Sequence, residues 1–279
     1  MTITKSIAKV RSIIKKQKLK NKIIGFVPTM GALHQGHLSL IKKARKDAGF
    51  LVVSIFVNPL QFGPKEDYRI YPRNFKKDRA LLEKERVDLI FYPYPKNMYT
   101  AGFSTYVEET SLSKSLCGKS RPGHFRGVAT VVTKLFNIVQ PDIAYFGRKD
   151  YQQAQVIKRL TQDLNIPAQI RILPIIRQKS GLALSSRNAY LSQKEEKKAL
   201  VLYQSLRLAR NLVKQGQRKP HFIKTKIAKL INSRKNLKID YIELVDPKTL
   251  KPVKKIDKKT LLALAIFVGK IRLIDNTII

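Results

Sequence analysis

Apolar residues form two kinds of pattern along the first two thirds of the chain. Short continuous apolar runs are typical of strands buried in a parallel sheet, and they cover residues 23–27, 50–57, 87–93, 141–146 and 170–176. Apolar residues three or four positions apart predict helices, which we expect at residues 1–22, 38–48 and 131–139, with a charged helix following Asp78. Strands that alternate with helices in this way predict an α/β fold with a parallel sheet.

The remainder of the chain follows a different order. Helices are predicted at about residues 193–214 and 222–233, and strands follow at residues 239–245, 261–268 and 271–274. Helices followed by a run of strands predict a small α+β domain. No long linker separates the two patterns, so we place a first domain at residues 1–175 and a second at residues 176–279.

Composition indicates a globular protein. The hydrophobic fraction is 43%, and no apolar run approaches the roughly 18–20 residues that a membrane helix needs. The amino terminus lacks the apolar core of a signal peptide. A single cysteine, Cys117, cannot form an internal disulfide, which fits a reducing compartment. These features predict a cytoplasmic protein without a membrane partner.

The charge is unusually positive. There are 56 Lys and Arg residues against 19 Asp and Glu residues, which gives a net charge of +37. Such an excess attracts polyanions. However, the lysines are spread along the whole chain, Trp is absent, and no zinc-finger or RNP-like spacing occurs. We therefore expect non-specific attraction to polyanions and no specific nucleic-acid partner.

The strongest chemical motif is the decapeptide Pro28-Thr29-Met30-Gly31-Ala32-Leu33-His34-Gln35-Gly36-His37. It joins a predicted strand end to a predicted helix start. A helix start presents unpaired N–H groups and the positive end of the helix dipole, which suit a phosphate. Two imidazoles can donate to the same anion, and Gly36 permits close approach to the backbone. The motif predicts a phosphate-binding turn, whereas each histidine taken alone fits an ordinary loop position.

Other polar residues also follow predicted strands. Asn58 and Gln61 follow residues 50–57, so we expect them at the same sheet edge as the His turn. Lys149 and Asp150 follow residues 141–146, where a lysine can bind phosphates and a carboxylate can accept from ribose hydroxyls. Arg121, His124 and Arg126 form a cationic cluster. It can hold a carboxylate or a pyrophosphate, and a solvated basic loop is the alternative.

In this order, the motifs resemble the pantoate–β-alanine ligase (pantothenate synthetase) family of nucleotidyl transferases with a His-Ile-Gly-His type signature. Besides the decapeptide, the resemblance includes Asn58-Pro59-Leu60-Gln61-Phe62, Tyr71-Pro72-Arg73, Lys149-Asp150-Tyr151-Gln152-Gln153, Leu184-Ser185-Ser186-Arg187 and Arg272-Leu273-Ile274-Asp275-Asn276. It implies a Rossmann-like nucleotide-binding domain followed by a small α+β lid domain. It also implies ATP-dependent condensation of (R)-pantoate with β-alanine through pantoyl adenylate, with Mg²⁺, in a homodimer.

The resemblance also implies roles for individual residues. Those expected to bind ATP are Met30, Gly31, Ala32, Leu33, His34, Gln35, Gly36, His37, Gly147, Arg148, Lys149, Asp150, Ile176, Leu184, Ser185, Ser186 and Arg187. The expected catalytic residues among them are His34, His37, Lys149 and Arg187. Gln61 is expected to bind both pantoate and β-alanine, and Gln153 to bind pantoate. Further expected contacts are Asn58, Arg121 and His124 for the substrates and Asp78 for the metal.

Two positions depart from the family pattern. Arg148 stands where relatives usually carry glutamate, and Lys77 interrupts an acidic pair next to Asp78. The role of His37 stays open at this point, because a proton donor and a phosphate ligand both fit it. Two other functions also remain: another nucleotidyl transferase that uses the same turn, and a basic nucleic-acid-binding module.

Overall fold

The computed structural model describes residues 1–64 and 66–279, and the chain divides into two compact units. The first unit comprises Met1–Ser111, Arg121–Arg148 and Gln153–Pro174, and the second comprises Leu112–Ser120, Lys149–Gln152 and Ile175–Ile279. The main division follows Pro174, beside the boundary placed after residue 175 from the sequence. Two short segments from the first part of the chain belong to the second unit.

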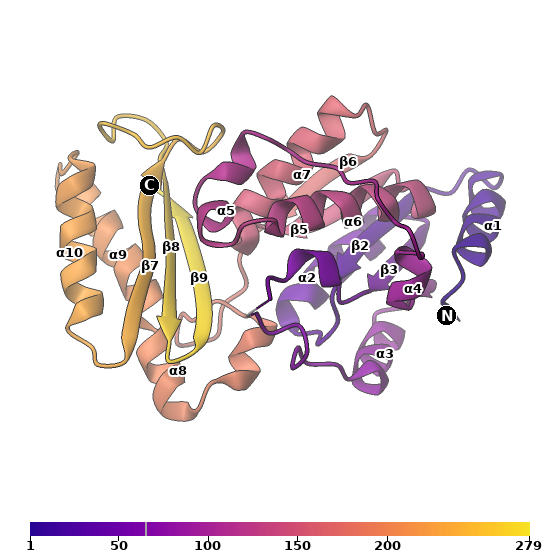
Figure 1. Ribbon diagram of the computed structural model, residues 1–279, viewed down its shortest axis with the longest axis horizontal. Helices are drawn as coiled ribbons and strands as arrows, with labels where there is room; N and C mark the ends of the chain where they lie inside the picture. Colours follow the sequence, from indigo (N-terminus) through magenta and orange to yellow (C-terminus); the bar gives the residue numbers. More distant parts are fainter. Residues whose placement is uncertain (65) are drawn as a thin grey trace. The chain divides into compact units, whose positions relative to one another are not determined.

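The first unit is built on a six-stranded parallel sheet with the order β1-β4-β3-β2-β5-β6 (Figure 1). The strands are β1 (Thr2–Thr4), β2 (Ile24–Thr29), β3 (Phe50–Ile55), β4 (Leu89–Phe91), β5 (Ile143–Gly147) and β6 (Gln169–Leu173). Continuous burial of β3 and β4 explains their unbroken apolar runs. The α/β fold class with a parallel sheet is confirmed.

Helices cover both faces of this sheet. They are α1 (Ile7–Lys18), α2 (Gln35–Asp47), α3 (Phe75–Lys84), α4 (Pro95–Met98), α6 (His124–Val139) and α7 (Tyr151–Asp163). Because side chains alternate along a strand, Val27 packs in the apolar cluster with Ile41 of α2, and Phe26 meets Phe136 of α6 with ring centroids 6.4 Å apart. Within the described residues, no helix has the length and hydropathy needed to cross a bilayer.

The two central strands separate toward their carboxyl ends. β2 pairs with β3 along its whole length, but pairs with β5 only through Gly25 and Phe26. Pro28 has no N–H to extend that ladder. The strand order also reverses between β2 and β5, since the chain builds β3 and β4 on one side and β6 on the other. Such a switch point is where open parallel sheets bind ligands.

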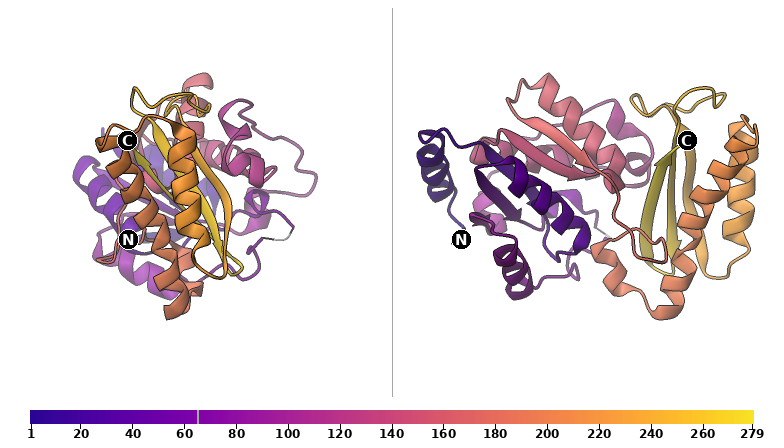
Figure 2. Two further views of the ribbon diagram at one scale, coloured as in Figure 1. Left: turned by 90° about the vertical axis from the view of Figure 1, so that its left-hand side faces the viewer. Right: turned by 180° about the vertical axis from the view of Figure 1, so that it is seen from behind.

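The second unit contains the antiparallel sheet β7-β8-β9, with helices on one face (Figure 2). Its elements are α8 (Gln193–Ala199), α9 (Val201–Lys214), α10 (Pro220–Asn232), β7 (Leu237–Val245), β8 (Leu261–Val268) and β9 (Ile271–Ile278), with α5 (Cys117–Ser120) from the inserted segment. Leu262, Leu264 and Ile266 alternate along β8 and pack in the core with α9 and α10. The α+β organisation of this part is also confirmed.

Several predicted elements differ in extent from the structure. Residues 1–22 do not form one helix, because Thr2–Thr4 pairs with β4 as an edge strand, and Ser6 accepts from Lys9 N (3.2 Å) to begin α1 afterwards. The helix expected at 193–214 is divided at Leu200 into α8 and α9. Similarly, α6 begins at His124, well before residue 131, because Gly123 at φ 80° allows the chain to turn directly into it.

Gly127 controls how closely α6 approaches the short 3₁₀ helix Pro59–Gln61, labelled η1. A Cβ at this position would lie 2.1 Å from Leu60 O and 2.6 Å from Gln61 N. We therefore expect Gly127→Ala to destabilise the protein by about 1–3 kcal/mol through overpacking, although helix propensity alone favours alanine by about 1 kcal/mol. Urea unfolding measures this difference.

Gly63→Ala is the matched control for this prediction. The nearest atom to a Cβ there is Glu66 Cγ at 3.7 Å, which is an ordinary contact. The control should unfold at nearly the wild-type urea concentration. Equal midpoints for Gly127→Ala and the wild type would contradict the close approach of α6 to η1.

Candidate active site

The turn from β2 into α2 is held by its two histidines. His34 is the N-cap residue of α2, and its Nδ1 accepts a hydrogen bond from Gly36 N at 3.1 Å. In return, His37 Nδ1 accepts from His34 N at 3.4 Å. The two rings lie 4.1 Å apart between centroids. This arrangement satisfies N–H groups that the first turn of a helix otherwise leaves unpaired.

These caps determine which ring nitrogen carries the proton. A nitrogen that accepts a hydrogen bond carries no hydrogen, so a neutral imidazole in this position has its proton on Nε2. Both histidines therefore use Nδ1 toward the backbone and carry the N–H at Nε2. A ring in this tautomer can donate to an anion without disturbing the cap.

Asp78 of α3 holds the preceding part of the same turn. The residue is 2% exposed, and its carboxylate accepts from Ala32 N (2.9 Å) and Leu33 N (2.8 Å). Gly31 and Ala32 have φ values of +83° and +50°, a conformation that costs free energy for alanine and so needs such support. Burial raises the pKa of Asp78 despite these two bonds.

The structure thus gives Asp78 a contact that the sequence did not predict. The family resemblance implies a metal ligand at this position, and that role stays a prediction. Within residues 1–64 and 66–279, no group of three or more His, Cys, Asp or Glu side chains is placed to hold a metal ion. The observed contact of Asp78 is with the backbone of the His turn.

Asn58 and Gln61 lie beside this turn, as their positions after β3 predicted. Both are buried, with exposed fractions of 1% and 8%. Asn58 Nδ2 donates to Gln61 Oε1 (3.1 Å) and to Gly127 O (3.0 Å), while its own Oδ1 accepts from Tyr99 O–H (2.7 Å). Gln61 Nε2 lies 3.1 Å from Met30 Sδ. The amide of Gln61 is therefore oriented by Asn58 on one side and contacts the His turn on the other.

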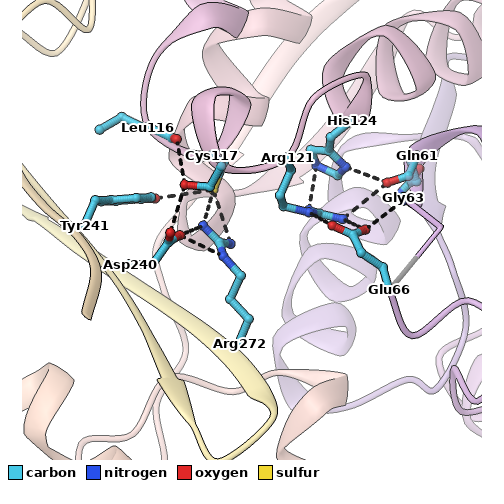
Figure 3. A network of polar contacts seen from close by, with 11 residues as sticks. Gln61, Gly63, Glu66, Leu116, Cys117, Arg121, His124, Asp240, Tyr241 and Arg272 are labelled. Carbon is cyan, nitrogen blue, oxygen red and sulfur yellow. Dashed lines mark hydrogen bonds and ion pairs between the residues drawn. The ribbon is translucent and has the colours of Figure 1, made fainter. Parts of the chain in front are cut away.

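Arg121 and His124 contact the backbone of Gln61, and a carboxylate neutralises the arginine (Figure 3). Arg121 forms a two-point ion pair with Glu66, with both N–O distances at 2.6 Å. It also lies 3.0 Å from His124 Nε2. Since an arginine only donates, His124 Nε2 accepts, and its Nδ1–H donates to Gln61 O at 2.8 Å.

This geometry changes the interpretation of the cationic cluster. Arg126 is exposed and its guanidinium lies 4.8 Å from the Tyr106 ring centroid, so it takes no part in the contacts of Arg121. Burial alone would raise the pKa of Glu66, but hydrogen bonds and charge from Arg121 lower it overall. Arg121 and His124 contact the main chain of Gln61, and Glu66 balances the charge of Arg121.

The end of β5 supplies the last predicted residues of the first unit. Gly147 ends the strand next to β2 in the sheet, and Arg148 follows it with an exposed side chain. Gln153 lies half-buried in the first turn of α7. These positions agree with the expectation that polar residues follow the carboxyl ends of the central strands.

In the second unit, Lys149 and Asp150 form a short turn that is held by its backbone. Lys149 Nζ lies 3.7 Å from Asp150 Oδ1, and the carbonyl of Lys149 accepts from Asn276 Nδ2 of β9 at 2.8 Å. The adjacent Gln152 is buried and binds the backbone of Leu112, Ser115 and Cys117. These backbone contacts hold the main chain of Lys149 in place.

Ile176 and Leu184 come together across a hairpin. Leu184 N donates to Ile176 O at 3.0 Å, and Arg177 pairs with Ala183 inside it. The chain then enters the 3₁₀ helix Ser186–Tyr190, labelled η4, with Ser185 Oγ accepting from Arg187 N at 3.2 Å. The predicted Ser185-Ser186-Arg187 segment thus begins a capped helical turn that the hairpin positions.

Sequence reasoning missed four residues that orient these groups: Glu66, Gln152, Asp275 and Asn276. Gln152, Asp275 and Asn276 fall inside motifs that carried the resemblance, but the motifs assigned them no contact. Glu66 is an acidic residue in a loop, and a single sequence offers no signal of its long-range partner. Membership in a family motif was therefore the one signal in the sequence for Gln152, Asp275 and Asn276, and there was no signal for Glu66.

The comparison with known sequences identifies the family. The profile of the Pantoate-beta-alanine ligase family matches residues 2–278. The chain belongs to this family. Among named ligases of the family, the pantothenate synthetases of Thermotoga petrophila and Thermotoga neapolitana are each 56% identical over 279 residues, covering all of this chain and all of theirs.

Solved structures of the same family agree with this assignment. The pantothenate synthetase of Thermus thermophilus has a TM-score of 0.94 at 44% identity, with 99% of each chain covered. The pantoate–β-alanine ligase of Francisella tularensis has a TM-score of 0.83 at 39% identity, with 100% of this chain and 97% of that chain covered. Its structure is described as a complex with an ATP compound and β-alanine.

The ion pair between Glu66 and Arg121 predicts a pH-dependent contribution to stability in this ligase. The pKa of Glu66 is lowered in the folded state, so its contribution is present above the usual value of 4.5 and is lost as the pH falls through the lowered value. Glu66→Gln should therefore be less stable than the wild type by about 1–3 kcal/mol at pH 7. Urea unfolding at several pH values measures the difference.

The difference between wild type and Glu66→Gln should shrink as the pH falls below 4.5. Glu83→Gln, at an exposed position of α3, is the control and should remain close to the wild type at pH 7. A stability difference for Glu66→Gln that stays constant from pH 7 into strong acid would contradict the ion pair.

Proposed function

We propose that this protein condenses (R)-pantoate with β-alanine, using ATP, to form pantothenate, AMP and pyrophosphate through a pantoyl-adenylate intermediate. The observation that carries the proposal is the family match over residues 2–278. The neutral, backbone-capped His34 and His37 at the start of α2 support it, because their geometry suits a phosphate ligand.

The first chemical step joins pantoate to the α-phosphate of ATP. A carboxylate oxygen of pantoate attacks the α-phosphorus, and the bond to pyrophosphate breaks. This step depends on positioning and on neutralised charge. Nε2–H of His34 and His37 would donate to phosphate oxygens, and the amino end of α2 would add its positive dipole. Lys149, Ser185, Ser186 and Arg187 would supply further charge and donors to the triphosphate.

The remaining predicted ATP contacts concern the nucleoside. Gly147 and Asp150 would hold the ribose, with Asp150 accepting from its hydroxyls, and Arg148 follows the same strand end. The backbone of Ile176, held against Leu184 by their hydrogen bond, would border the adenine. Met30, Gly31, Ala32, Leu33, Gln35 and Gly36 would line the phosphates through the turn itself.

Magnesium enters this proposal as part of the MgATP substrate. Mg²⁺ usually keeps several waters and is held by substrate phosphates with one or two protein carboxylates. Asp78 is the carboxylate at the His turn. Its two oxygens accept from Ala32 N and Leu33 N, and a carboxylate oxygen has a second lone pair for a metal or its water. The same contacts also let Asp78 maintain the turn, whichever ligand is bound.

Gln61 and Gln153 would hold pantoate by hydrogen bonds, with Gln61 also bordering β-alanine. Asn58 supports this role because it fixes which way the Gln61 amide faces. Arg121 and His124 hold the carbonyl of Gln61, so we propose that they position the glutamine instead of binding a substrate carboxylate directly.

The second chemical step forms the amide bond. The neutral amine of β-alanine attacks the acyl carbon of pantoyl adenylate, the bond from that carbon to the AMP oxygen breaks, and the amine loses a proton. No covalent enzyme intermediate is needed. We further propose a homodimer, as the family resemblance implies, and light scattering of the purified protein tests this separately.

Release of AMP tests the function directly. Purified protein with MgATP should release AMP and form pantothenate only when pantoate and β-alanine are both present. Pantoate alone should support exchange of labelled pyrophosphate into ATP, because adenylate formation is reversible. AMP release at the same rate with and without pantoate would refute the proposal and would indicate a different nucleotidyl transferase activity.

Two substitutions of His37 separate phosphate binding from proton donation. An asparagine can reproduce the Nδ1 acceptor that caps α2, whereas a glutamine amide reaches toward the position of Nε2. We expect His37→Asn to lower adenylate formation about 100-fold or more, and His37→Gln to retain at least about tenfold more activity than His37→Asn. Pyrophosphate exchange measures the rate of adenylate formation. The melting temperature of His37→Asn should be higher than that of His37→Gln, because asparagine keeps the cap of α2.

The glutamine variant decides the outcome because an amide donates a hydrogen bond but does not release its proton. Equal losses in the two variants would assign His37 as a proton donor and would contradict its role as a phosphate ligand. Full activity in both would remove His37 from the site.

Gln61→Ala should weaken pantoate binding while leaving ATP binding largely intact. The substitution removes the amide that Asn58 orients, so we expect the KM for pantoate to rise about tenfold or more. Steady-state kinetics with each substrate varied in turn measures this. Gln162→Ala, at an exposed position of α7, is the control. An unchanged KM for pantoate in Gln61→Ala would contradict the assignment.

A further inference from the structure

The motif Arg272-Leu273-Ile274-Asp275-Asn276 has no role in the mechanism above, yet it places polar side chains inside the second unit. It lies on β9, the last strand of the sheet. Asp275 and Asn276 are buried, with exposed fractions of 2% and 5%. Buried polar side chains persist only with hydrogen-bond partners, so their partners indicate what the strand holds.

The first partner is the predicted phosphate lysine. Asn276 Nδ2 donates to the carbonyl oxygen of Lys149 at 2.8 Å, across 127 residues of sequence. Asn276 pairs with Ala263 of β8, and this small neighbour belongs to the sheet face opposite the core residues Leu262 and Leu264. The turn that contains Lys149 therefore lies against the sheet face that α9 and α10 leave uncovered.

The second partner belongs to the hairpin that leads into Ser185-Ser186-Arg187. Asp275 accepts from both terminal nitrogens of Arg177, at 2.6 and 2.8 Å, and the guanidinium also donates to Gly181 O at 3.0 Å. The same guanidinium stacks over Tyr203 of α9, 4.8 Å from its ring centroid. Asp275 pairs with Leu264, which places it on the helix-covered face.

Arg272 adds a third contact from the same strand (Figure 3). It forms an ion pair with Asp240 of β7 and contacts the Cys117 sulfur at 3.4 and 3.5 Å. Ser120 of the same segment donates to Asp240 at 2.9 Å. Burial works against the charge of Arg272, but Cys117, Tyr241 and Asp240 raise its pKa overall. This contact fixes the inserted segment Leu112–Ser120 to the sheet.

We infer that β9 positions both ATP-binding segments of the second unit, with Asn276 acting on Lys149 and Asp275 acting on the Arg177 hairpin that carries Ser185, Ser186 and Arg187. Neither residue needs to touch ATP for this role. Adjacent residues of a strand face opposite sides of the sheet, so two neighbouring positions can hold two segments that approach from different faces. The inference rests on the proposed function, since it assigns Lys149 and Arg187 to ATP.

The test is a double-mutant cycle between Asn276 and Lys149. Asn276→Ala removes the donor to the Lys149 carbonyl, so we expect kcat/KM for ATP to fall about threefold to tenfold while the KM for pantoate stays nearly constant. In a Lys149→Ala background the side chain that Asn276 positions is already absent. There, Asn276→Ala should lower kcat/KM for ATP by less than about twofold further.

Two other variants keep the test decisive if the alanine variant unfolds. Asn276→Asp keeps the size of the side chain but points a carboxylate at the Lys149 carbonyl, and it should lose at least as much as Asn276→Ala. Thr277→Val is the matched control, because it removes a buried hydroxyl from the next position of β9, whose partners are the exposed Arg210 and Ile278 O. Its kcat/KM for ATP should match the wild type.

The same cycle with Asp275→Asn and Arg187→Ala tests the second contact, and coupling is expected there too. If the fold-losses in kcat/KM for ATP of the two single variants multiply to give the loss of the double variant in both cycles, the residues are not coupled and the inference is overturned. A normal kcat/KM for ATP in Asn276→Ala would also overturn it. Equilibrium binding of a non-hydrolysable ATP analogue gives a readout that does not require pantoate chemistry. A wild-type protein that binds the analogue but releases no pantoate-dependent AMP would refute the proposed function and leave the positioning role testable.

Discussion

The hydrogen-bond demand of the backbone between β2 and α2 is the constraint on which the first unit's site depends. The chain passes through positive φ at Gly31 and Ala32 and then starts a helix, so several consecutive N–H groups have no partner within the backbone. Asp78, His34 and His37 supply the acceptors. The site and the local fold are therefore the same set of contacts, and a change to one alters the other.

The second unit solves a similar problem with a strand instead of a helix start. Lys149 lies in a short turn, and Arg187 follows a hairpin. Burying Asp275 and Asn276 in β9 gives both segments a rigid support. Sites built on regular elements hold their geometry better than sites built on loops alone. Here the hydrogen bonds from β9 hold two loop segments against a rigid sheet.

The sequence predicted the parts of this protein that depend on local pattern. Apolar runs located β2 to β6, and the apolar spacing from Leu38 onward located α2, although the helix begins earlier, at Gln35. What it missed depends on partners distant in sequence. Thr2–Thr4 is a strand only because β4 offers an edge, Leu112–Ser120 joins the second unit through contacts with Gln152 and β9, and Glu66 finds Arg121 across 55 residues. The contact of Asp78 was missed for the same reason.

The proposed phosphate role places two requirements on the side chains of His34 and His37, and histidine meets both. The helix start needs an acceptor close to the backbone, and a phosphate needs a donor farther out. Lysine and arginine offer only donors, and aspartate and glutamate offer only acceptors when ionised. An imidazole carries an acceptor at Nδ1 and a donor at Nε2 on opposite sides of a rigid ring. Because the backbone N–H groups occupy Nδ1, the fold itself selects the tautomer with its proton on Nε2, the nitrogen that our proposal assigns to the phosphates.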